Sequence, residues 1–509
     1  MRRIGIDVGG TNTDAVLLDG ARIVHAVKAP TTADVTGGIV AALAALTRHP
    51  AVKGRADAVV IGTTHFINAV VQRRSLSRVA AIRIGLPASA SLPPFCDWPA
   101  DLAELVRAEM FMLEGGHDVD GREIMPFDEA AMREAARAIR AKGIAAVGVS
   151  SIFSPLDASH EERAGQILAE ECPGAAVTLS HRLGRIGLLE RENAALLNAA
   201  LAGLARDTIA GFREAVAKID APLYITQNDG TVMSAEAAVA LPVMSFASGA
   251  TNSMRGAAFL SGIAEAMVVD VGGTSTDIGQ LRRGFPREAN SVVEIGEVRT
   301  LFRMPDLFSL GLGGGSIVRE APLAVGPQSV GYRLVEEAQV FGGGTVTATD
   351  AAVAAGIAAI GDRPPRIDRR TAEAVLALAR ATIEDAVDRM KTEAGEVTLI
   401  AVGGGAFLVP DRLAGVAEVI RVPHGDCANA VGAATAQISG ETDQVYRDMP
   451  RAEAIAAAEA QAVARATEAG ADPATIQTIE VEDMPLAYLP GNALRVRVRV
   501  AGEMGAIPR

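Results

Sequence analysis

Short aliphatic runs alternate with longer Ala-rich runs of helical period along most of the chain. Aliphatic runs between turn residues are typical of buried strands, and apolar residues at helical spacing indicate helices. The pattern predicts strands at residues 4–8, 15–18, 58–62, 79–84, 144–150, 175–179, 222–227, 243–247, 266–270, 278–281 and 397–402. It predicts helices at residues 35–46, 65–74, 128–142, 158–171, 186–217, 350–360, 371–391 and 427–438. Because strands that alternate with helices pair mainly in parallel, we expect an α/β fold.

The pattern changes after Gly440, where a predicted Ala/Glu-rich helix at 451–469 precedes predicted strands at 476–481 and 494–500. We therefore expect three units, which comprise residues 1–185, residues 186–440 and a small α+β unit at 441–509. A Pro- and Ser-rich stretch at 87–99, which carries Trp98, is predicted to be a loop and a candidate lid.

One turn sequence occurs twice, each time directly after an aliphatic strand. Asp7-Val8-Gly9-Gly10-Thr11-Asn12-Thr13-Asp14 and Asp270-Val271-Gly272-Gly273-Thr274-Ser275-Thr276-Asp277 share the pattern D-V-G-G-T-x-T-D. Such a repeat indicates a duplicated unit. It is neither a Walker A loop nor a dinucleotide fingerprint, because it has no G-K-[ST] and no helix begins at its glycines.

The residue types of the repeat suit a phosphate. Gly9, Gly10, Gly272 and Gly273 leave the backbone free to approach a ligand closely, so that amide groups can face phosphate oxygens. Four threonine hydroxyls, those of Thr11, Thr13, Thr274 and Thr276, are candidate phosphate donors. The alternative is a pair of tight β-turns without a ligand.

Asp7 and Asp270 end the two strands, and they are our candidates for Mg²⁺ ligands and for orienting an attacking group. Two such turns that face each other would hold the phosphates of ATP from both sides. The alternative for both residues is turn capping. Asp14 and Asp277 either belong to the site or cap their hairpins, and the sequence leaves both readings open.

Two further glycine clusters are candidates for nucleotide contacts. Gly403, Gly404 and Gly405 follow a predicted strand, and such a turn can lie against a purine and ribose or serve only packing. Residues 313–315, which are Gly313, Gly314 and Gly315, either approach phosphate or substrate through their amides or act as a loop hinge.

Several single residues have both a functional and a structural interpretation. His65 is a candidate for proton transfer, since its ordinary pKa lies near ~6.5, or only a hydrogen-bonding residue at a helix start. His181, Arg182 and Arg185 form a basic turn that either binds an anion or is solvated. For Asn68, Asn228 and Asp229 the sequence leaves both a functional and a structural interpretation open. Asp350 is a candidate helix N-cap, and Cys427 is predicted to be buried rather than nucleophilic.

The composition limits which kinds of molecule the protein is expected to bind and in which cellular compartment it is expected to lie. The 509 residues carry 48 Lys and Arg against 61 Asp and Glu, a net charge of −13, which argues against nucleic-acid binding. Three widely spaced cysteines predict neither a disulfide framework nor a zinc ribbon, and they suggest a reducing compartment. The sequence shows neither a signal-peptide pattern nor a membrane-spanning run, so we expect a cytoplasmic protein.

The paired turns and the later Gly-Gly-Gly turn resemble the ATPase superfamily of actin, sugar kinases and the heat-shock chaperone. Within it, the chain resembles the hydantoinase/oxoprolinase A family, which includes N-methylhydantoinase A subunits, 5-oxoprolinase and the acetone carboxylase β subunit. The resemblance spans about residues 1–440. It is carried by residues 62–64, 68–69, 180–181, 190–193, 227–230, 233–236, 248–249, 313–316, 325–329 and 347–350.

The resemblance implies two ribonuclease H-like lobes that close around ATP and Mg²⁺. It also implies ATP-driven opening of a cyclic amide such as a hydantoin, a lactam or 5-oxoproline. The family's hydrolytic step is associated with a B-type subunit or domain, so a hetero-oligomer with a B-type partner, or a homo-oligomer, is expected.

Two other kinds of function remain open at this point. The chain could be a small-molecule kinase or a carboxylase subunit of the same superfamily. Alternatively, it is a nucleotide-switched binding protein, whose lobes change angle and partner affinity between its ATP and ADP states.

Overall fold

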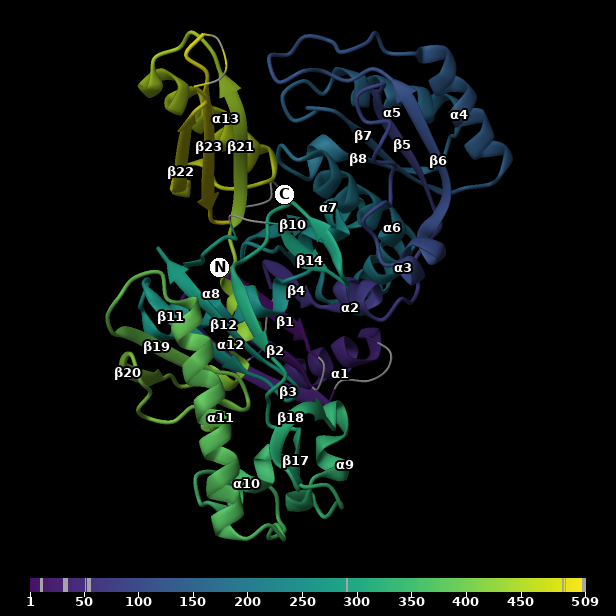
Figure 1. Cartoon of the computed structure of the whole chain (residues 1–509). Helices are drawn as coiled ribbons and strands as arrows, with labels where there is room; N and C mark the ends of the chain where they lie inside the picture. The colour runs from purple at the N-terminus through teal and green to yellow at the C-terminus, as the bar shows by residue number, and fades with distance from the viewer. Residues whose placement is uncertain are drawn as a thin grey trace.

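The computed structural model describes residues 1–9, 12–30, 35–50, 52, 56–289, 292–487, 489 and 491–505. Its helices alternate with strands for most of the chain, as the α/β pattern predicts (Figure 1). The helices are α1 (Val35–Arg48), α2 (His65–Val71), α3 (Ala100–Val106), α4 (Glu129–Ala141), α5 (Ser159–Glu171), α6 (Leu188–Val216), α7 (Ala235–Ala240), α8 (Ser248–Ser261), α9 (Leu334–Glu337), α10 (Ala348–Ala354), α11 (Arg369–Met390), α12 (Ala428–Thr435) and α13 (Arg451–Glu468).

A nine-stranded sheet contains the first copy of the repeated turn. Its strands, in order, are β22 (Gln477–Pro485), β23 (Leu494–Gly502), β21 (Ile438–Tyr446), β10 (Val232–Ser234), β9 (Leu223–Thr226), β4 (Ala58–Thr63), β1 (Arg2–Val8), β2 (Asn12–Asp19) and β3 (Arg22–Pro30). β1 and β2 form an antiparallel hairpin in which Asp7 pairs with Asp14, and β4 lies parallel to β1.

A six-stranded sheet repeats this arrangement around the second copy. Its strands are β13 (Phe285–Pro286), β12 (Thr276–Arg282), β11 (Ala266–Val271), β19 (Val397–Val402) and β20 (Val416–Arg421), with β16 (Leu307–Leu310) against β12. Asp270 pairs with Asp277 in the same register, and β19 lies parallel to β11. The sequence repeat is therefore also a structural repeat, with one copy in each lobe.

Helices α8 and α12 separate the two sheets and pack against each other (Figure 1). Met254 and Ala257 of α8 share a core with β11 and β19, whereas Ala430 and Val431 of α12 pack on β2. A Cβ atom on Gly256 would lie 1.9 Å from the carbonyl oxygen of Ala428. The two helices thus approach as closely as glycine permits, and each covers one lobe.

A parallel four-stranded sheet forms a separate layer. It consists of β6 (Arg107–Glu114), β5 (Val79–Leu86), β7 (Ala146–Ser151) and β8 (Ala176–Leu179). Two hairpins, β14 (Val293–Ile295) with β15 (Val298–Thr300) and β17 (Ser316–Glu320) with β18 (Leu323–Ser329), complete the described strands.

The stretch at 87–99 is held against α6 and does not behave as a free lid. The indole of Trp98 donates to the Asn193 side chain at 2.7 Å, and Arg83 donates to the carbonyl of Leu92. Arg83 is itself fully buried and pairs with Glu192. These buried contacts fix the loop to the helix behind it.

Some predicted elements were wrong or missing. The strand expected at 243–247 is a 3-10 helix, Pro242–Ser245, because a short buried apolar run has the same pattern in either conformation. The strands β3 and β6 were missed. Asp350 lies at the third helical position of α10, where it shares a capping box with the N-cap Thr347, so the predicted N-cap was displaced by three residues.

The C-terminal strands continue the first sheet rather than forming one of their own. β21 begins at Ile438 and pairs in parallel with β10, while β23 lies between β21 and β22. The predicted unit boundaries at 185 and 440 remain predictions, with β21 crossing the second of them.

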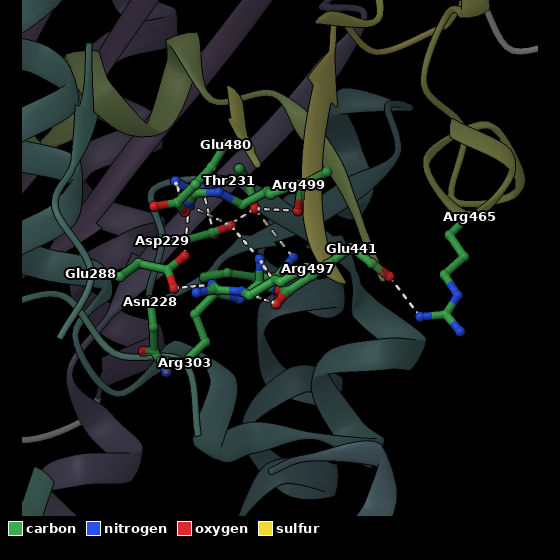
Figure 2. A network of polar contacts seen from close by, with 12 residues as sticks. Asn228, Asp229, Thr231, Glu288, Arg303, Glu441, Arg465, Glu480, Arg497 and Arg499 are labelled. Atoms are coloured by element: carbon green, nitrogen blue, oxygen red, sulfur yellow. Dashed lines mark hydrogen bonds and ion pairs between the residues drawn. The ribbon is translucent and has the colours of Figure 1, made fainter. Parts of the chain in front are cut away.

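A buried network of ion pairs joins these C-terminal strands to the second lobe (Figure 2). Asp229 binds Arg303 at 2.7 Å, and Arg303 lies 3.1 Å from Glu441 on β21. Arg497 on β23 contacts both Glu441 and Glu288. Because these charges are removed from water, each depends on its partner for stability.

We expect this network to make the fold sensitive to acid. Burial would raise the pKa values of Glu441 and Asp229, but the neighbouring arginines outweigh it and lower both. Their stabilisation is therefore complete above the ordinary carboxyl pKa of ~4 and is lost as pH falls below it. Melting temperature measured between pH 7 and pH 3 should fall steeply below about pH 4.

A variant pair separates the network from general acid effects. Glu441→Gln should cost about 3–5 kcal/mol at pH 7, because it leaves buried arginines unpaired, and should show a smaller further loss in acid. The exposed Glu396→Gln is the matched control and should melt like the parent. Equal melting curves for Glu441→Gln and the parent would contradict the assigned role.

Candidate functional site

A cleft of about 710 Å³ lies between the two lobes, and both repeated turns line it. The first lobe contributes Asp7 and Gly9, and the second contributes Asp270 and the turn at 272–275. Residues of α2, α8 and α12 complete its walls. The duplicated motifs therefore face one cavity from opposite sides.

The two turns have the same internal geometry. The amide of Gly9 donates to the carbonyl of Asn12 at 3.0 Å, and the amide of Gly272 donates to that of Ser275 at 2.9 Å. Within the described residues, the amides of 273, 274 and 275 donate to no protein group. Gly10 and Thr11 lie outside the described residues. The second turn thus presents consecutive donor groups at the cleft, as an anion site requires.

Asp7 and Asp270 are held in surroundings that disfavour their charged forms. Burial, followed by the charge of Asp14, raises the pKa of Asp7 to about 7. Burial is also the main cause that raises the pKa of Asp270 to about 6, against a hydrogen bond from Ser253 that lowers it. The charge of Asp270 contributes to the raised pKa of Asp7. Two buried carboxylates that repel each other are stabilised by a shared cation.

A polar bridge from the central helices links these two carboxylates. Ser253 Oγ of α8 lies 2.5 Å from Asp270 Oδ2 and also contacts Asn429 Oδ1, so that its single hydroxyl proton can be donated to either acceptor. Asn429 of α12 donates from Nδ2 to Asp7 Oδ2 at 3.2 Å. Neither residue belongs to the repeat, so no sequence pattern pointed to them, and only the close helix crossing brings them together.

Other polar groups at the cleft differ in whether they have a hydrogen-bond partner within the protein. Asp7 Oδ1 is buried without a well-aligned donor in the described part of the chain, although the Asn252 side chain lies near enough to lower the pKa of Asp7. Lys28 of β3, also missed, donates to Asp14 Oδ2 at 2.9 Å and to the carbonyl of Asp426 at 3.1 Å. The cleft therefore combines an unsatisfied carboxylate oxygen with one ammonium group.

Not every predicted threonine faces the cleft. Thr13 and Thr276 are fully buried, and Thr276 Oγ1 donates to the carbonyl of Leu312 at 2.6 Å. Side chains alternate along a strand, so the neighbours Asp14 and Asp277 line the cleft instead. Of the predicted threonines in the described part of the chain, Thr274 alone reaches it.

His65 does not line the cleft, although the N-cap Thr64 and the helix residues Ile67 and Asn68 do. It is the first residue of α2, and its ring lies edge-on to that of Phe66 with 6.2 Å between the ring centroids. Burial lowers its pKa. The geometry therefore gives no support to the predicted catalytic role of His65.

The glycine cluster at 313–315 supports the second turn from behind. Gly314 donates to the carbonyl of Gly272 at 3.0 Å, and Gly315 donates to that of Gly273 at 2.7 Å. The amide of Gly313 donates to Ser316 Oγ at 2.8 Å. Since all three amides are occupied within the protein, the predicted direct phosphate contact through them is not supported.

In the glycine cluster at 403–405, some residues are placed for contact with a nucleotide and others serve packing. Gly403 and Gly404 line the cleft, and no atom lies within 4 Å of a Cβ built on Gly404. Gly405 donates to the carbonyl of Val271 and has a packing role. Gly403 adopts a positive φ of 88°, which a side chain would disfavour. One end of the cluster thus leaves room for a ligand.

Four further candidates have structural partners. Asn228 donates to the carbonyls of Val243 and Arg303, and Asp229 belongs to the buried ion network. Asp350 is occupied in its capping box. Burial raises the pKa of the Cys427 thiol to about 12, which disfavours a nucleophilic thiolate.

Two family profiles match the chain. That of the hydantoinase/oxoprolinase N-terminal region matches residues 3–172, and that of hydantoinase/oxoprolinase matches residues 191–362. The caprolactamase subunit alpha of Pseudomonas jessenii is 28% identical over 84% of this chain and 69% of its own length. The acetophenone carboxylase gamma subunit of Aromatoleum aromaticum is 29% identical over 69% of this chain and 53% of its own length.

Solved structures show the same fold. The ATP-dependent caprolactamase of Pseudomonas jessenii matches 99% of this chain and 88% of its own with a TM-score of 0.75 and 21% identity. Nucleotide-free acetone carboxylase matches 100% of this chain and 89% of its own with a TM-score of 0.66 and 18% identity. The expected α/β fold is confirmed, with the two copies of the repeated hairpin in separate sheets. No described helix is long and apolar enough to span a bilayer.

The first prediction from the site concerns the paired carboxylates. Asp270→Asn should lower ATP turnover by about 100-fold or more, since it removes a charge at the cleft while keeping the size of the side chain. The expected fold is unchanged, which circular dichroism and melting temperature check. The exposed Asp362→Asn is the control, and turnover at the parental rate in Asp270→Asn would reject the assigned role.

The polar bridge through Ser253 and Asn429 should also matter for ATP turnover. Asn429→Ala removes the hydrogen bond to Asp7 and should reduce ATP turnover by about tenfold. Thr435→Ser at the far end of the same helix is the control and should turn over ATP like the parent. A parental rate in Asn429→Ala would show that the bridge is not needed to position Asp7.

Proposed function

Because the chain belongs to the hydantoinase/oxoprolinase family, we propose that it is the ATP-dependent subunit of a cyclic-amide hydrolase. Its substrate would be a hydantoin, a lactam or a ring similar to 5-oxoproline. The single observation that carries this proposal is the cleft in which two copies of one turn, each with its strand-end aspartate, face each other.

The cleft residues fit a magnesium nucleotide. Asp7 has a buried oxygen without a well-aligned donor among the described residues, and carboxylate oxygens are the ligands that Mg²⁺ prefers. Asp7 and Asp270 would hold the ion, which neutralises phosphate charge when bound. The amides of residues 273–275 and the ammonium of Lys28 would bind phosphate oxygens.

A ring amide is a poor electrophile because its nitrogen donates electrons into the carbonyl group. In the proposed reaction, the carbonyl oxygen attacks the γ-phosphorus of ATP, the bond to the β–γ bridging oxygen breaks, and ADP leaves. Water adds to the carbon of the imidate phosphate, and the C–N bond breaks as the nitrogen takes a proton. A second water hydrolyses the acyl phosphate to a carboxylate and inorganic phosphate.

In this reaction the chain's own residues position and neutralise rather than form covalent bonds. The bridge through Ser253 and Asn429 holds the carboxylates of the two lobes in one geometry. Closure of the lobes would exclude water from the phosphoryl transfer.

A partner subunit is part of the proposal. Two relatives are named as subunits, alpha of caprolactamase and gamma of acetophenone carboxylase. We infer that a B-type chain assembles with this one and contributes to the hydrolytic steps. A carboxylase is the second candidate, favoured by the acetophenone carboxylase relative and by the fold shared with acetone carboxylase.

The test is ADP release from magnesium ATP with a panel of hydantoin, N-methylhydantoin, 5-oxoproline and caprolactam. It is run with and without the product of the neighbouring gene, with mass spectrometry of the products and Asp270→Asn as the negative control. At least one ring should stimulate ADP release and yield the ring-opened amino acid. ADP release that requires bicarbonate would indicate the carboxylase, and a stable phosphorylated product would indicate a kinase.

A further inference from the structure

A second cavity, of about 670 Å³, lies where the parallel four-stranded sheet meets the C-terminal strands. Figure 1 shows β7 and β8 on one side and β21 with α13 on the other. The segments that follow the carboxyl ends of β7, β8 and β9 line it. This edge of a parallel sheet is where α/β folds generally bind ligands.

The cavity is separate from the nucleotide cleft. Met244 and Arg303 line the second cavity, whereas Phe246 and Met304, on the same two segments, line the cleft. Asn228 holds these segments together, since it donates to the carbonyls of Val243 and Arg303. The two spaces therefore lie back to back across one wall.

One part of the cavity wall is apolar, so its side chains can cover a short aliphatic part of a ligand. These residues come from three segments, and they are Leu156, Leu183, Ile186, Met233, Leu241 and Met244. The volume falls within the range of small-molecule sites, roughly 300–1,000 Å³.

Most of the charged residues in the wall already have partners. Arg303 pairs with Asp229, Arg495 with Asp443, and Arg182 with Glu162 at 2.8 Å. His181 lies between Glu161 and Glu162, at 2.8 and 3.0 Å. These groups need no ligand for neutrality.

Arg185 differs, because the one carboxylate with which it forms an ion pair in the described part of the chain is shared. It lies 3.3 Å from Glu288, which already pairs with Arg497 and with Arg499. Burial lowers the pKa of Arg185 and the charge of Arg497 adds to the effect, against the carboxylates of Glu288, Glu441 and Asp443, which raise it. A guanidinium with 18% of its side chain exposed thus lines the cavity and shares its ion-pair partner with two other arginines.

Arg465 is the second such cation. Its guanidinium donates to the backbone carbonyl of Glu441 at 2.6 Å (Figure 2). Arg465 is exposed, and no ion pair with a carboxylate is found for it among the described residues. The wall of the cavity therefore carries five arginines against two carboxylates, those of Glu441 and Asp443, next to an apolar surface.

We propose that this cavity binds a small organic monocarboxylate with a short apolar body. Arg185 pairs with the carboxylate, Arg465 adds positive potential, and the leucine, isoleucine and methionine side chains cover the body. The site is additional to the proposed function and does not depend on nucleotide chemistry in the cleft.

The test is titration calorimetry of the full chain with sodium hexanoate at low ionic strength, with hexan-1-ol as the uncharged probe. Hexanoate should bind with one-to-one stoichiometry, and hexan-1-ol should bind at least about tenfold more weakly, because it lacks the charge-assisted hydrogen bonds. Saturating magnesium ATP should leave the hexanoate affinity unchanged. Displacement by magnesium ATP would place the anion in the cleft and overturn the proposal.

Variants locate the bound anion. Arg185→Gln should weaken hexanoate binding by about tenfold, and Arg185→Lys should restore part of it because the charge returns. Arg182→Gln, in the same wall but neutralised by Glu162, is the matched control and should leave affinity unchanged. Melting temperature and magnesium ATP binding check that each variant folds. Parental hexanoate affinity in a folded Arg185→Gln, or equal affinity for hexan-1-ol, would overturn the proposal.

Discussion

The close crossing of α8 and α12 is the constraint on which the arrangement of the lobes depends. Gly256 and Gly432 leave no room for a Cβ atom, since one on Gly432 would lie 1.8 Å from the carbonyl oxygen of Asn252. This approach brings Ser253 and Asn429 within hydrogen-bond distance of each other. Each helix also covers the sheet of one lobe, so the crossing sets where Asp7 and Asp270 face each other.

The electrostatics of the molecule follow from what is buried on each side of this crossing. In the cleft, burial raises the pKa values of two carboxylates, and the charge of Lys28 only partly opposes this effect at Asp270. At the C-terminal junction, buried carboxylates are surrounded by arginines that lower their pKa values. The first arrangement favours a bound cation, whereas the second holds the structure together.

Two glycine-rich segments of similar composition have different roles, one at the cleft and one in support of the fold. The amides of residues 273–275 have no acceptor within the described protein and belong to a turn that lines the cleft, whereas the amides of Gly314 and Gly315 donate to that turn and the amide of Gly313 donates to Ser316. The arginines around the second cavity show the same division, because Arg182 has its own carboxylate and Arg185 shares one. In both cases, an amide or arginine that already has a partner within the protein stabilises the fold, whereas one without its own partner is available to a ligand.

The sequence by itself determined the duplicated hairpins, the alternating α/β order and the two strand-end aspartates, because each depends on contacts within about a dozen residues. Only the tertiary structure decided that Ser253 and Asn429 bridge those aspartates, that Lys28 enters the cleft, and that His65 and Thr276 turn away from it. It also decided which glycine amides stay free. These outcomes depend on helix crossing, strand pairing and burial between segments far apart in the chain, which no local pattern records.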